Sequence, residues 1–208
     1  NSEFVSLLQD DSGVTARFAN GTSARADVLV GADGNVSAVR SFMFPEEAPK
    51  FAGQVAFRSL IPYELVPESL RFRGSVMSAG PGRYLLCYPL RGGRIMNLVG
   101  LVQSNAWEEE GWSIPATNEE FANAFPGYEP DLLTLIRNIP AGDVFKWGLR
   151  DREPLKTWTV GRVTMLGDAA HPMTPFLGQG ACMAIEDGLL LGRAFGASKD
   201  YSEALRRR

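Results

Sequence analysis

One stretch near the C-terminal end, residues 161–195, restricts the possible folds more than any other part of the chain. It begins with a short β-rich run from Arg162 to Leu166, continues through a loop rich in Gly and Pro, and ends in a long apolar run. This order predicts a strand, a loop and a helix that begins near Ala181. Asp168 then stands at the carboxyl end of the strand, where open α/β sheets bind their ligands. The stretch therefore predicts a binding site on an α/β unit.

The loop between this strand and helix has residues that suit close contact with a ligand. Pro172 and Pro175 stiffen it, while Gly178 and Gly180 allow its backbone to approach a ligand closely. The N-terminus of a helix carries roughly half a positive charge and unpaired N–H groups, so it suits an anion. A β-loop-α unit with a purely structural role would need neither an Asp at the strand end nor paired glycines at the helix start. We therefore predict that the loop binds a ligand.

The predicted helix is apolar on nearly every side, from Ala181 to Phe195. We therefore expect it to be buried. Gly188, Gly192 and Gly196 recur every fourth residue and form a smooth ridge. A neighbouring strand or helix is expected to pack on that ridge.

A second strand that ends in an Asp-Gly pair is predicted near the N-terminus. It is the third strand of a β-meander whose strands are predicted over residues 3–9, 14–18 and 23–30. Asn20-Gly21 is a strong hairpin signal between the last two strands. Asp33 and Gly34 follow the third strand, just before a short helix predicted over 37–42. Such a turn is common alone, but two strands that both end in Asp and Gly indicate one shared site.

The central part of the chain has a different pattern. After a linker at 45–49, long strands without intervening helices are predicted over residues 51–61, 71–78, 83–90 and 94–103. This pattern indicates an antiparallel sheet. Thr117 and Glu120 form a capping box before a helix at 121–125, and Pro130 opens a second helix. We expect these two helices to cover one face of the sheet, and a strand at 145–150 to follow them.

Composition and charge argue against several classes of partner. The chain has 21 Lys plus Arg against 24 Asp plus Glu, and its net charge of −3 argues against a nucleic-acid partner. No apolar run approaches the roughly 18 residues of a membrane span, and no signal peptide is recognised, so a cytoplasmic location without a membrane partner is expected.

The cysteines and the one histidine indicate no metal site. Cys87 and Cys182 lie far apart in the sequence, so we expect both to be reduced core residues. His171 is the only histidine and cannot make a metal site by itself. No second titrating group can be placed beside it from the sequence. We therefore expect His171 to order its loop rather than to act as a catalytic base.

The segment GDAAHPMTPFLGQGACMAIED, residues 167–187, resembles the second flavin-binding motif of the FAD-dependent aromatic hydroxylases. These are single-component monooxygenases related to p-hydroxybenzoate and salicylate hydroxylase. The resemblance implies that Asp168, next to Gly167, binds the ribityl chain of FAD, and that Pro175 lines the face where oxygen reacts. It also implies that the backbone amides of Gly180, Ala181 and Cys182 contact the N1 and C2 carbonyl edge of the flavin. Gly178 and Gln179 are expected to belong to the same cofactor-binding segment. Many members carry Asn in place of Cys182, so the contact implied there is one of the backbone.

The segment DVLVGADGNVSAVR, residues 27–40, is similar to a second motif of the same family. The family uses it to bind FAD and the pyrophosphate of NAD(P)H, and Asp33, Gly34 and Arg40 occupy the matching positions. The family also has a G-x-G-x-x-G unit that holds the adenosine half of FAD, and this sequence contains none. We therefore expect the chain to correspond to the middle and later part of a hydroxylase.

These observations together predict a mixed α/β (α+β) fold. Residues 1–44 and 153–208 are expected to form part of a Rossmann-like FAD-binding domain with a β-meander, and residues 45–152 a substrate domain with an antiparallel sheet. The resemblance implies an FAD- and NAD(P)H-dependent monooxygenase that hydroxylates a small aromatic substrate with oxygen, although this chain alone is expected to be inactive. Two alternatives remain: a non-catalytic flavoprotein-like chain without bound FAD, and a flavin epoxidase that acts on an alkene. The sequence predicts neither the substrate nor the oligomeric state.

Overall fold

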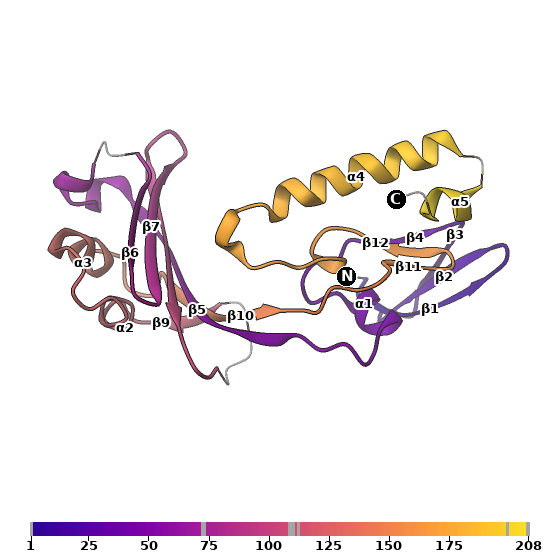
Figure 1. Ribbon diagram of the computed structural model, residues 1–208, viewed down its shortest axis with the longest axis horizontal. Coiled ribbons are helices and arrows are strands. Elements are labelled where there is room, and N and C mark those ends of the chain that lie inside the picture. The colour runs from indigo at the N-terminus through magenta and orange to yellow at the C-terminus, as the bar shows by residue number, and fades with distance from the viewer. Residues whose placement is uncertain (1, 72–73, 108–110, 112, 199, 207–208) are drawn as a thin grey trace. The chain divides into compact units, whose positions relative to one another are not determined.

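A computed structural model of the chain describes residues 2–71, 74–107, 111, 113–198 and 200–206 (Figure 1). The chain divides into two compact units. Unit 1 combines Asn1–Lys50 with Asp151–Arg208, and unit 2 is Phe51–Arg150.

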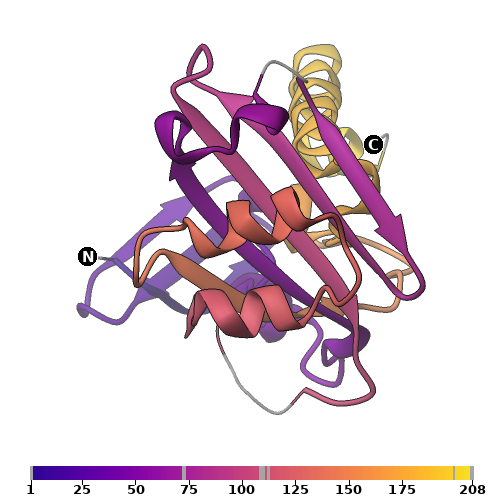
Figure 2. The ribbon, with the colours of Figure 1, turned by 90° about the vertical axis from the view of Figure 1, so that its left-hand side faces the viewer.

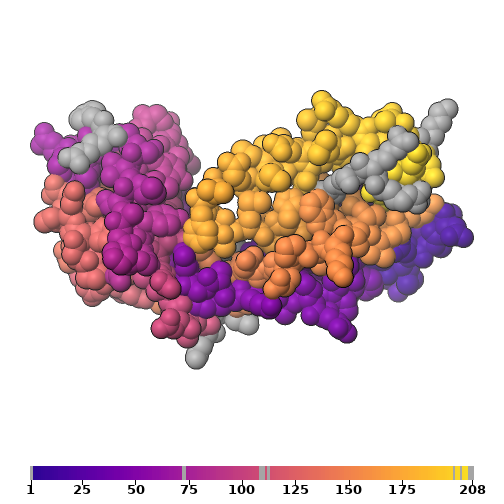
Figure 3. All heavy atoms as spheres, viewed as in Figure 1, coloured from indigo at the N-terminus to yellow at the C-terminus, as the bar shows by residue number. Residues whose placement is uncertain are grey.

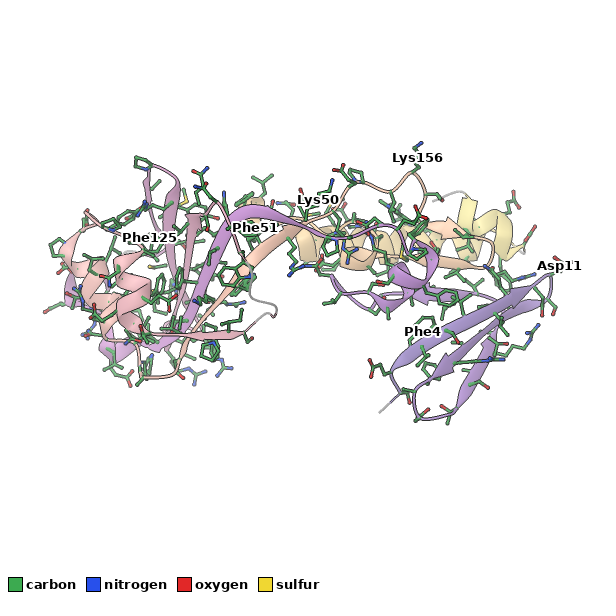
Figure 4. All side chains as sticks on the ribbon, turned by 90° about the horizontal axis from the view of Figure 1, so that it is seen from below. Phe4, Asp11, Lys50, Phe51, Phe125 and Lys156 are labelled. Carbon is green, nitrogen blue, oxygen red and sulfur yellow. The ribbon has the colours of Figure 1, made fainter. Side chains whose placement is uncertain are left out.

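The first sheet of unit 1 is a β-meander. It contains β1 (Phe4–Asp10), β2 (Gly13–Phe18) and β3 (Ser23–Ala26), which pair antiparallel in that order. Asp11 lies at the tip of the β1–β2 hairpin (Figure 4). Gly21 has a φ of 81°, a left-handed conformation that favours Gly, so the predicted Asn-Gly turn is confirmed.

The prediction of one strand over residues 23–30 is wrong. The chain bends at Asp27, and β4 (Leu29–Gly31) pairs instead with β12 (Val163–Met165) in a second sheet, of order β11-β12-β4. Arg162 stabilises this bend, because its guanidinium donates to the carbonyl of Asp27 and its own carbonyl accepts from the Leu29 amide. The β11 strand is Thr159–Val160. The sequence of residues 23–30 contains no Gly or Pro that could have revealed the bend.

Unit 1 has its own apolar core beneath α1 (Ala38–Met43) and the second sheet. Gly31 is required there, because a Cβ atom on it would lie 2.9 Å from Cγ1 of Val39 and 3.3 Å from Cγ of Met165. The buried residues of this core are Leu7, Val14, Val39, Val163, Met165, Ala169 and Ala170.

Unit 2 is built on a six-stranded sheet of order β6-β7-β8-β5-β10-β9. The pairs β5–β8, β6–β7, β7–β8 and β9–β10 are antiparallel, so the predicted antiparallel sheet is confirmed. The strands are β5 (Lys50–Pro62), β6 (Val76–Gly80), β7 (Arg83–Leu90), β8 (Ile95–Gln103), β9 (Ile114–Ala116) and β10 (Val144–Asp151). Single 3₁₀ turns at Tyr63–Leu65 and Glu68–Leu70 connect β5 to β6. Of the strand predicted over 71–78, residues 72 and 73 lie outside the described residues.

Two helices, α2 (Asn118–Asn123) and α3 (Pro130–Arg137), lie across one face of this sheet (Figure 2). The predicted cap is present, because the Thr117 hydroxyl accepts from the Glu120 amide at 3.0 Å. Phe121 stacks on Phe57 with ring centroids 4.9 Å apart. Phe125, labelled in Figure 4, lies in the same core. Each such fully buried side chain contributes roughly 1.5–3 kcal/mol.

The opposite side of the sheet, here called the open face, is more exposed. A small buried cluster of Ala56, Leu101 and Leu149 lies on it, with Trp147 packed against the cluster. Towards the other end of the strands, large apolar side chains are exposed to solvent, among them Leu60, Met77 and Phe145.

The long helix of unit 1, α4 (Gly180–Ala197), follows the two sheets and leads to α5 (Tyr201–Arg206). Figure 3 shows α4, in orange to yellow, at the surface of unit 1. Only Asp187 and Leu191 of α4 are buried, and Ile185 is 73% exposed, so the prediction of a buried helix is wrong. Added Cβ atoms on the ridge glycines would meet no described atom within 4 Å. The helix has an apolar surface, and the described residues supply no partner for most of it.

Candidate functional site

The two strands that were predicted to end in Asp and Gly lie side by side. β4 and β12 pair in parallel, with Gly31 opposite Met165. The register continues past the strands, since the Leu166 amide donates to the Gly31 carbonyl at 3.0 Å. Because parallel strands end at the same edge of a sheet, the segments that carry Asp33 and Asp168 leave the sheet together. This edge is the candidate site.

At this edge, β12 runs into a tight turn that presents Asp168. Gly167 has a φ of 58°, and its carbonyl accepts from the amides of Ala170 and His171 at 2.9 Å each. An added Cβ on Gly167 would lie 3.1 Å from Cβ of Ala184, so both the backbone conformation and the space favour Gly. Ala169 and Ala170 are buried while Asp168 is exposed. The turn therefore buries its alanines and leaves its carboxylate available.

The start of α4 lies next to that carboxylate. An added Cβ on Gly180 would lie 3.8 Å from Oδ1 of Asp168. Gln179 provides no side-chain cap, and no acidic residue occupies the first turn. No hydrogen-bond acceptor for the amides of Gly180, Ala181 and Cys182 is found among the described residues. A carboxylate and a set of free N–H donors thus lie together, as a ligand with both hydroxyl and anionic groups requires.

The loop before α4 is exposed and held in a defined conformation. Pro175–Leu177 form a 3₁₀ turn, and Gly178 ends it with a φ of 63° and an amide that donates to the Pro175 carbonyl at 3.1 Å. Pro175, Phe176 and Leu177 are all exposed. Cys182 is exposed too, so the expectation that it is a core residue is wrong, whereas Cys87 is buried as predicted.

A buried carboxylate, Asp187, joins α4 to the turn that carries Asp168. Its Oδ2 accepts from the Gly167 amide at 2.8 Å and lies 2.6 Å from Nε2 of His171. The His171 ring also lies 5.0 Å from the Trp158 ring. The expectation that His171 has no titrating neighbour is wrong, because Asp187 is 16 residues away in sequence. The acidic pair Glu186-Asp187 within an otherwise largely apolar helical run was the signal that could have revealed this contact.

The Asp-Gly segment after β4 is held by its own side chains. Oδ1 of Asp33 accepts from the Ser37 hydroxyl at 2.6 Å, and Oδ2 accepts from the Val39 amide at 3.1 Å. Gly34 has a φ of 79°. Arg40 is 1% exposed and donates from Nη1 to the carbonyls of Ala169 and Ala170, at 3.1 and 2.8 Å. The structure thus places Asp33 and Arg40 in contacts that order the edge, while Asp168, Pro175 and the start of α4 are exposed.

Sequence reasoning missed a partly buried carboxylate, Glu47. Its Oε2 accepts from Nε of Arg40 at 2.9 Å and from Nη1 of Arg152, and both arginines are buried. Burial alone would raise the pKa of Glu47, but the hydrogen bonds from Arg40 and Arg152 outweigh it and hold the pKa below its ordinary value. Glu47 lies in the predicted linker, where no periodic pattern distinguishes a partly buried, paired acid from a solvated one.

Two other kinds of feature were searched for in the described part of the chain. It contains no group of three or more His, Cys, Asp or Glu side chains that could hold a metal ion. None of its helices is long and apolar enough to cross a membrane.

Comparison with known proteins links this geometry to a cofactor. The family model described as "FAD binding domain" matches residues 1–200. The chain is 40% identical over 208 residues to 3-hydroxybenzoate 6-hydroxylase 1 of Aquipseudomonas alcaligenes, covering 100% of this chain and 52% of that protein. It is 36% identical over 210 residues to 6-hydroxynicotinate 3-monooxygenase of Bordetella bronchiseptica, covering 99% and 54%. The chain thus spans about half the length of these curated relatives.

Solved structures show the same fold. Klebsiella pneumoniae HpxO complexed with FAD and uric acid matches with a TM-score of 0.83 and 29% identity, over 99% of this chain and 52% of that one. A salicylate hydroxylase substrate complex matches with a TM-score of 0.85 and 28% identity, over 99% and 54%. The mixed α/β fold predicted from the sequence is thereby confirmed.

Proposed function

Because the chain belongs to the FAD binding domain family, we propose that it serves an FAD- and NAD(P)H-dependent monooxygenase that hydroxylates a small aromatic substrate with oxygen. The observation that carries the proposal is the free N-terminus of α4 beside the exposed carboxylate of Asp168. Bound FAD supplies the redox and oxygen-transfer chemistry, and the residues of this chain bind and orient it.

Asp168 and the start of α4 have separate tasks in this proposal. The Asp168 carboxylate accepts hydrogen bonds from hydroxyl groups of the ribityl chain. The amides of Gly180, Ala181 and Cys182 donate to the N1 and C2 carbonyl edge of the flavin, where the helix dipole favours negative charge. The donor set fits this group, because it combines one acceptor for hydroxyls with several donors for an electron-rich edge.

The remaining site residues keep the positions that the family resemblance implies. Pro175, on the exposed 3₁₀ turn, lines the face at which oxygen reacts, and Gly178 and Gln179 shape the approach to α4. Asp33, Gly34 and Arg40 occupy the motif that helps bind FAD and the pyrophosphate of NAD(P)H. Because Arg40 is buried, we propose that it acts by holding the carbonyls of Ala169 and Ala170 rather than by direct contact with FAD.

The named relatives suggest the substrate class. The curated matches include hydroxylases of 3-hydroxybenzoate and of 6-hydroxynicotinate. Both compounds are single rings with a hydroxyl and a carboxylate. We therefore propose a ring acid of this kind as the substrate, and a cytoplasmic location for the enzyme.

The first test concerns the site. In a polypeptide extended to the full length of the relatives, Asp168→Ala should weaken FAD binding by about 1–3 kcal/mol, because a ribityl hydroxyl loses its acceptor. Asp168→Asn should weaken it less, since the amide oxygen still accepts. Titration of flavin fluorescence measures both, with Asp143→Ala in unit 2 as the matched control. Equal affinities for the Ala and Asn variants would contradict the assignment.

The second test concerns the reaction. The extended polypeptide should consume NAD(P)H and oxygen together with a hydroxylated benzoate or pyridine acid, and the product should gain one oxygen atom by mass. The present chain, which contains no G-x-G-x-x-G sequence, should be colourless after purification. Labelled oxygen that enters only water or peroxide, for every ring acid tried, would refute the hydroxylase proposal.

A further inference from the structure

Three charged side chains next to the candidate site form a continuous set of contacts, here called the Arg152–Glu47–Arg40 relay. Nη1 of Arg152 donates to Oε2 of Glu47, and the same oxygen accepts from Nε of Arg40 at 2.9 Å. The side chains of Arg152 and Arg40 are 4% and 1% exposed, and that of Glu47 is 15% exposed. One carboxylate oxygen thus joins an arginine of α1 to an arginine that follows β10.

One end of the relay holds the segment that follows β4. Nη2 of Arg152 donates to the carbonyl of Asn35 at 3.3 Å. Asn35 comes directly after the Asp33-Gly34 pair, in a turn where the Ser37 amide donates to the Gly34 carbonyl at 3.0 Å. The chain that leaves this turn is therefore fixed by an arginine 117 residues away in the sequence.

The other end of the relay holds the turn that presents Asp168. Nη1 of Arg40 donates to the carbonyls of Ala169 and Ala170, at 3.1 and 2.8 Å. These two residues come directly after the exposed Asp168. The position of the Asp168 backbone thus depends on the guanidinium of Arg40, and Glu47 orients that guanidinium.

The relay is poorly suited to a role in stability alone. It carries two positive charges and one negative charge, and a buried ion pair often contributes no more to stability than apolar side chains of the same volume. Oε1 of Glu47 and Nε of Arg152 are buried and have no hydrogen-bond partner among the described residues. A bidentate pair of an arginine with a carboxylate would use two nitrogens and both oxygens. Arg152 instead directs its second donor to the backbone of the site.

We propose that Glu47 and Arg152 are positioning residues for the cofactor. Through the relay they hold the Asn35 segment and the Asp168 turn at the spacing that lets both segments contact one FAD molecule. Neither residue touches the cofactor, because their effect passes through backbone carbonyls. This inference rests on the proposed function for the identity of the cofactor, and it adds two residues outside the family's motifs to those that determine its binding.

The first test follows the ¹³C NMR signals of the three carbonyls that accept from the relay, in the present chain. Arg152→Gln should shift the Asn35 signal, because this carbonyl loses a charged donor. Glu47→Gln should shift all three signals, because both arginines lose the carboxylate that orients them. Glu46→Gln, at the exposed neighbouring glutamate, is the matched control and should shift none of them.

The second test titrates FAD into a polypeptide extended to the full length of the relatives. Glu47→Gln and Arg152→Gln should each raise the dissociation constant of FAD roughly 10-fold, the equivalent of one charge-assisted hydrogen bond. Because both residues act through one contact, the double variant should bind FAD little more weakly than the weaker single variant. Arg152→Lys keeps a positive charge opposite Glu47 and should bind FAD more tightly than Arg152→Gln.

A third variant separates positioning from stability. Val14 is 2% exposed in the apolar core of unit 1 and is not part of the relay. Val14→Ala should lower the midpoint of thermal unfolding and leave the affinity for FAD unchanged below the transition. Circular dichroism shows which variants are folded at the temperature of the titration. If Glu47→Gln is unfolded there, Arg152→Gln and Arg152→Lys decide the question.

Four outcomes would overturn the proposal. These are wild-type affinity for FAD in both single variants, an equal loss of affinity in Val14→Ala, additive losses in the double variant, and unchanged carbonyl signals in Glu47→Gln. All of them leave the proposed function intact, since the wild type still binds FAD. An extended wild-type polypeptide that binds no FAD would refute the proposed function, and the carbonyl signals of the present chain alone would then decide whether the relay orders both segments.

Discussion

Unit 2 and unit 1 each contain a helix with large apolar side chains, and the two helices differ in what covers those side chains. The eight residues of α3 bury Leu132, Leu135 and Ile136 against the sheet of unit 2. The 18 residues of α4 bury only Asp187 and Leu191. An apolar sequence therefore predicts that a helix can be buried, while a facing element decides whether it is. Large exposed apolar surfaces usually mark a contact with another molecule or segment.

The first and largest test uses the same substitution in both helices. Leu135→Ala should lower the free energy of unfolding by about 2–5 kcal/mol, because Leu135 is fully buried and its loss leaves a cavity. Leu189→Ala, at a side chain that is 53% exposed, should change it by no more than about 0.5 kcal/mol. Urea unfolding followed by tryptophan fluorescence measures both. Similar losses in the two variants would show that α4 is covered in solution.

Substitution of one glycine in each unit by Ala should change the free energy of unfolding in opposite directions. Gly100→Ala in unit 2 should destabilise by about 1–3 kcal/mol, because the new Cβ would lie 2.5 Å from Cε2 of Phe121 and 2.8 Å from Cζ of Phe125. Gly188→Ala in α4 meets no described atom within 4 Å and should stabilise the helix by about 0.5–1 kcal/mol. Thermal unfolding by circular dichroism compares them. Destabilisation by Gly188→Ala would reveal a neighbour on the glycine ridge.

Within unit 1, the buried carboxylate of Asp187, which ties α4 to the turn at Gly167, can be removed. Asp187→Ala should lower the free energy of unfolding by about 1–3 kcal/mol, because the Gly167 amide and His171 lose their common acceptor. Asp187→Asn should cost less, since its oxygen still accepts. Hydrogen exchange of the Gly167 amide reports the contact directly, with Glu186→Gln as an exposed control on the same helix. Unchanged exchange in Asp187→Ala would exclude this link.

The two units should also respond to opposite extremes of pH. Burial raises the pKa of the Cys87 thiol in unit 2 from 9.0 to about 12. The folded thiol stays neutral while the unfolded one ionises, so this contribution is complete below about pH 9 and is lost as the pH rises towards 12, by about 1.4 kcal/mol per unit. Unfolding free energy measured from pH 8 to 11 should fall in the wild type and fall less in Cys87→Ala.

In unit 1 the corresponding loss of folding stability is expected at acid pH. The pKa of Glu47 is lowered, so its contribution is present above its ordinary value of 4.5 and is lost as the pH falls through the lowered folded pKa. Stability of unit 1 should therefore decline below about pH 4.5 in the wild type. Glu47→Gln should be less stable at neutral pH and should lack this part of the acid dependence. An identical acid slope in both proteins would contradict the assignment.

The elements of the fold that depend on local chemistry could be predicted from the sequence. The Thr117 cap, the Pro130 helix start, the Asn20-Gly21 turn and the long strands of unit 2 all follow from short-range rules. The bend at Asp27 could not be predicted, because it depends on Arg162, which is 135 residues away.

In the candidate site, too, local features could be predicted from the sequence and long-range contacts could not. Asp168 and the glycines before α4 have a recognisable spacing, and the structure brings them to one edge. The partners of His171 and Arg40 are Asp187 and Glu47, which only the folded chain places beside them. Exposure of Cys182 and Ile185 was missed, since a sequence pattern states which faces are apolar and not what lies against them.

The ion pair of Glu47 with Arg152 has a consequence for how this protein can be altered. Unit 2 is an insertion, because the chain leaves unit 1 after Lys50 and returns at Asp151. Glu47 precedes the exit and Arg152 follows the return, and their ion pair fastens the two ends of the insertion to each other within unit 1. Such closed ends are where whole domains can be exchanged with little disturbance to the host. Residues 51–150 can therefore be exchanged as one domain among relatives. The junctions should lie between Glu47 and Arg152, so that their ion pair is kept in unit 1.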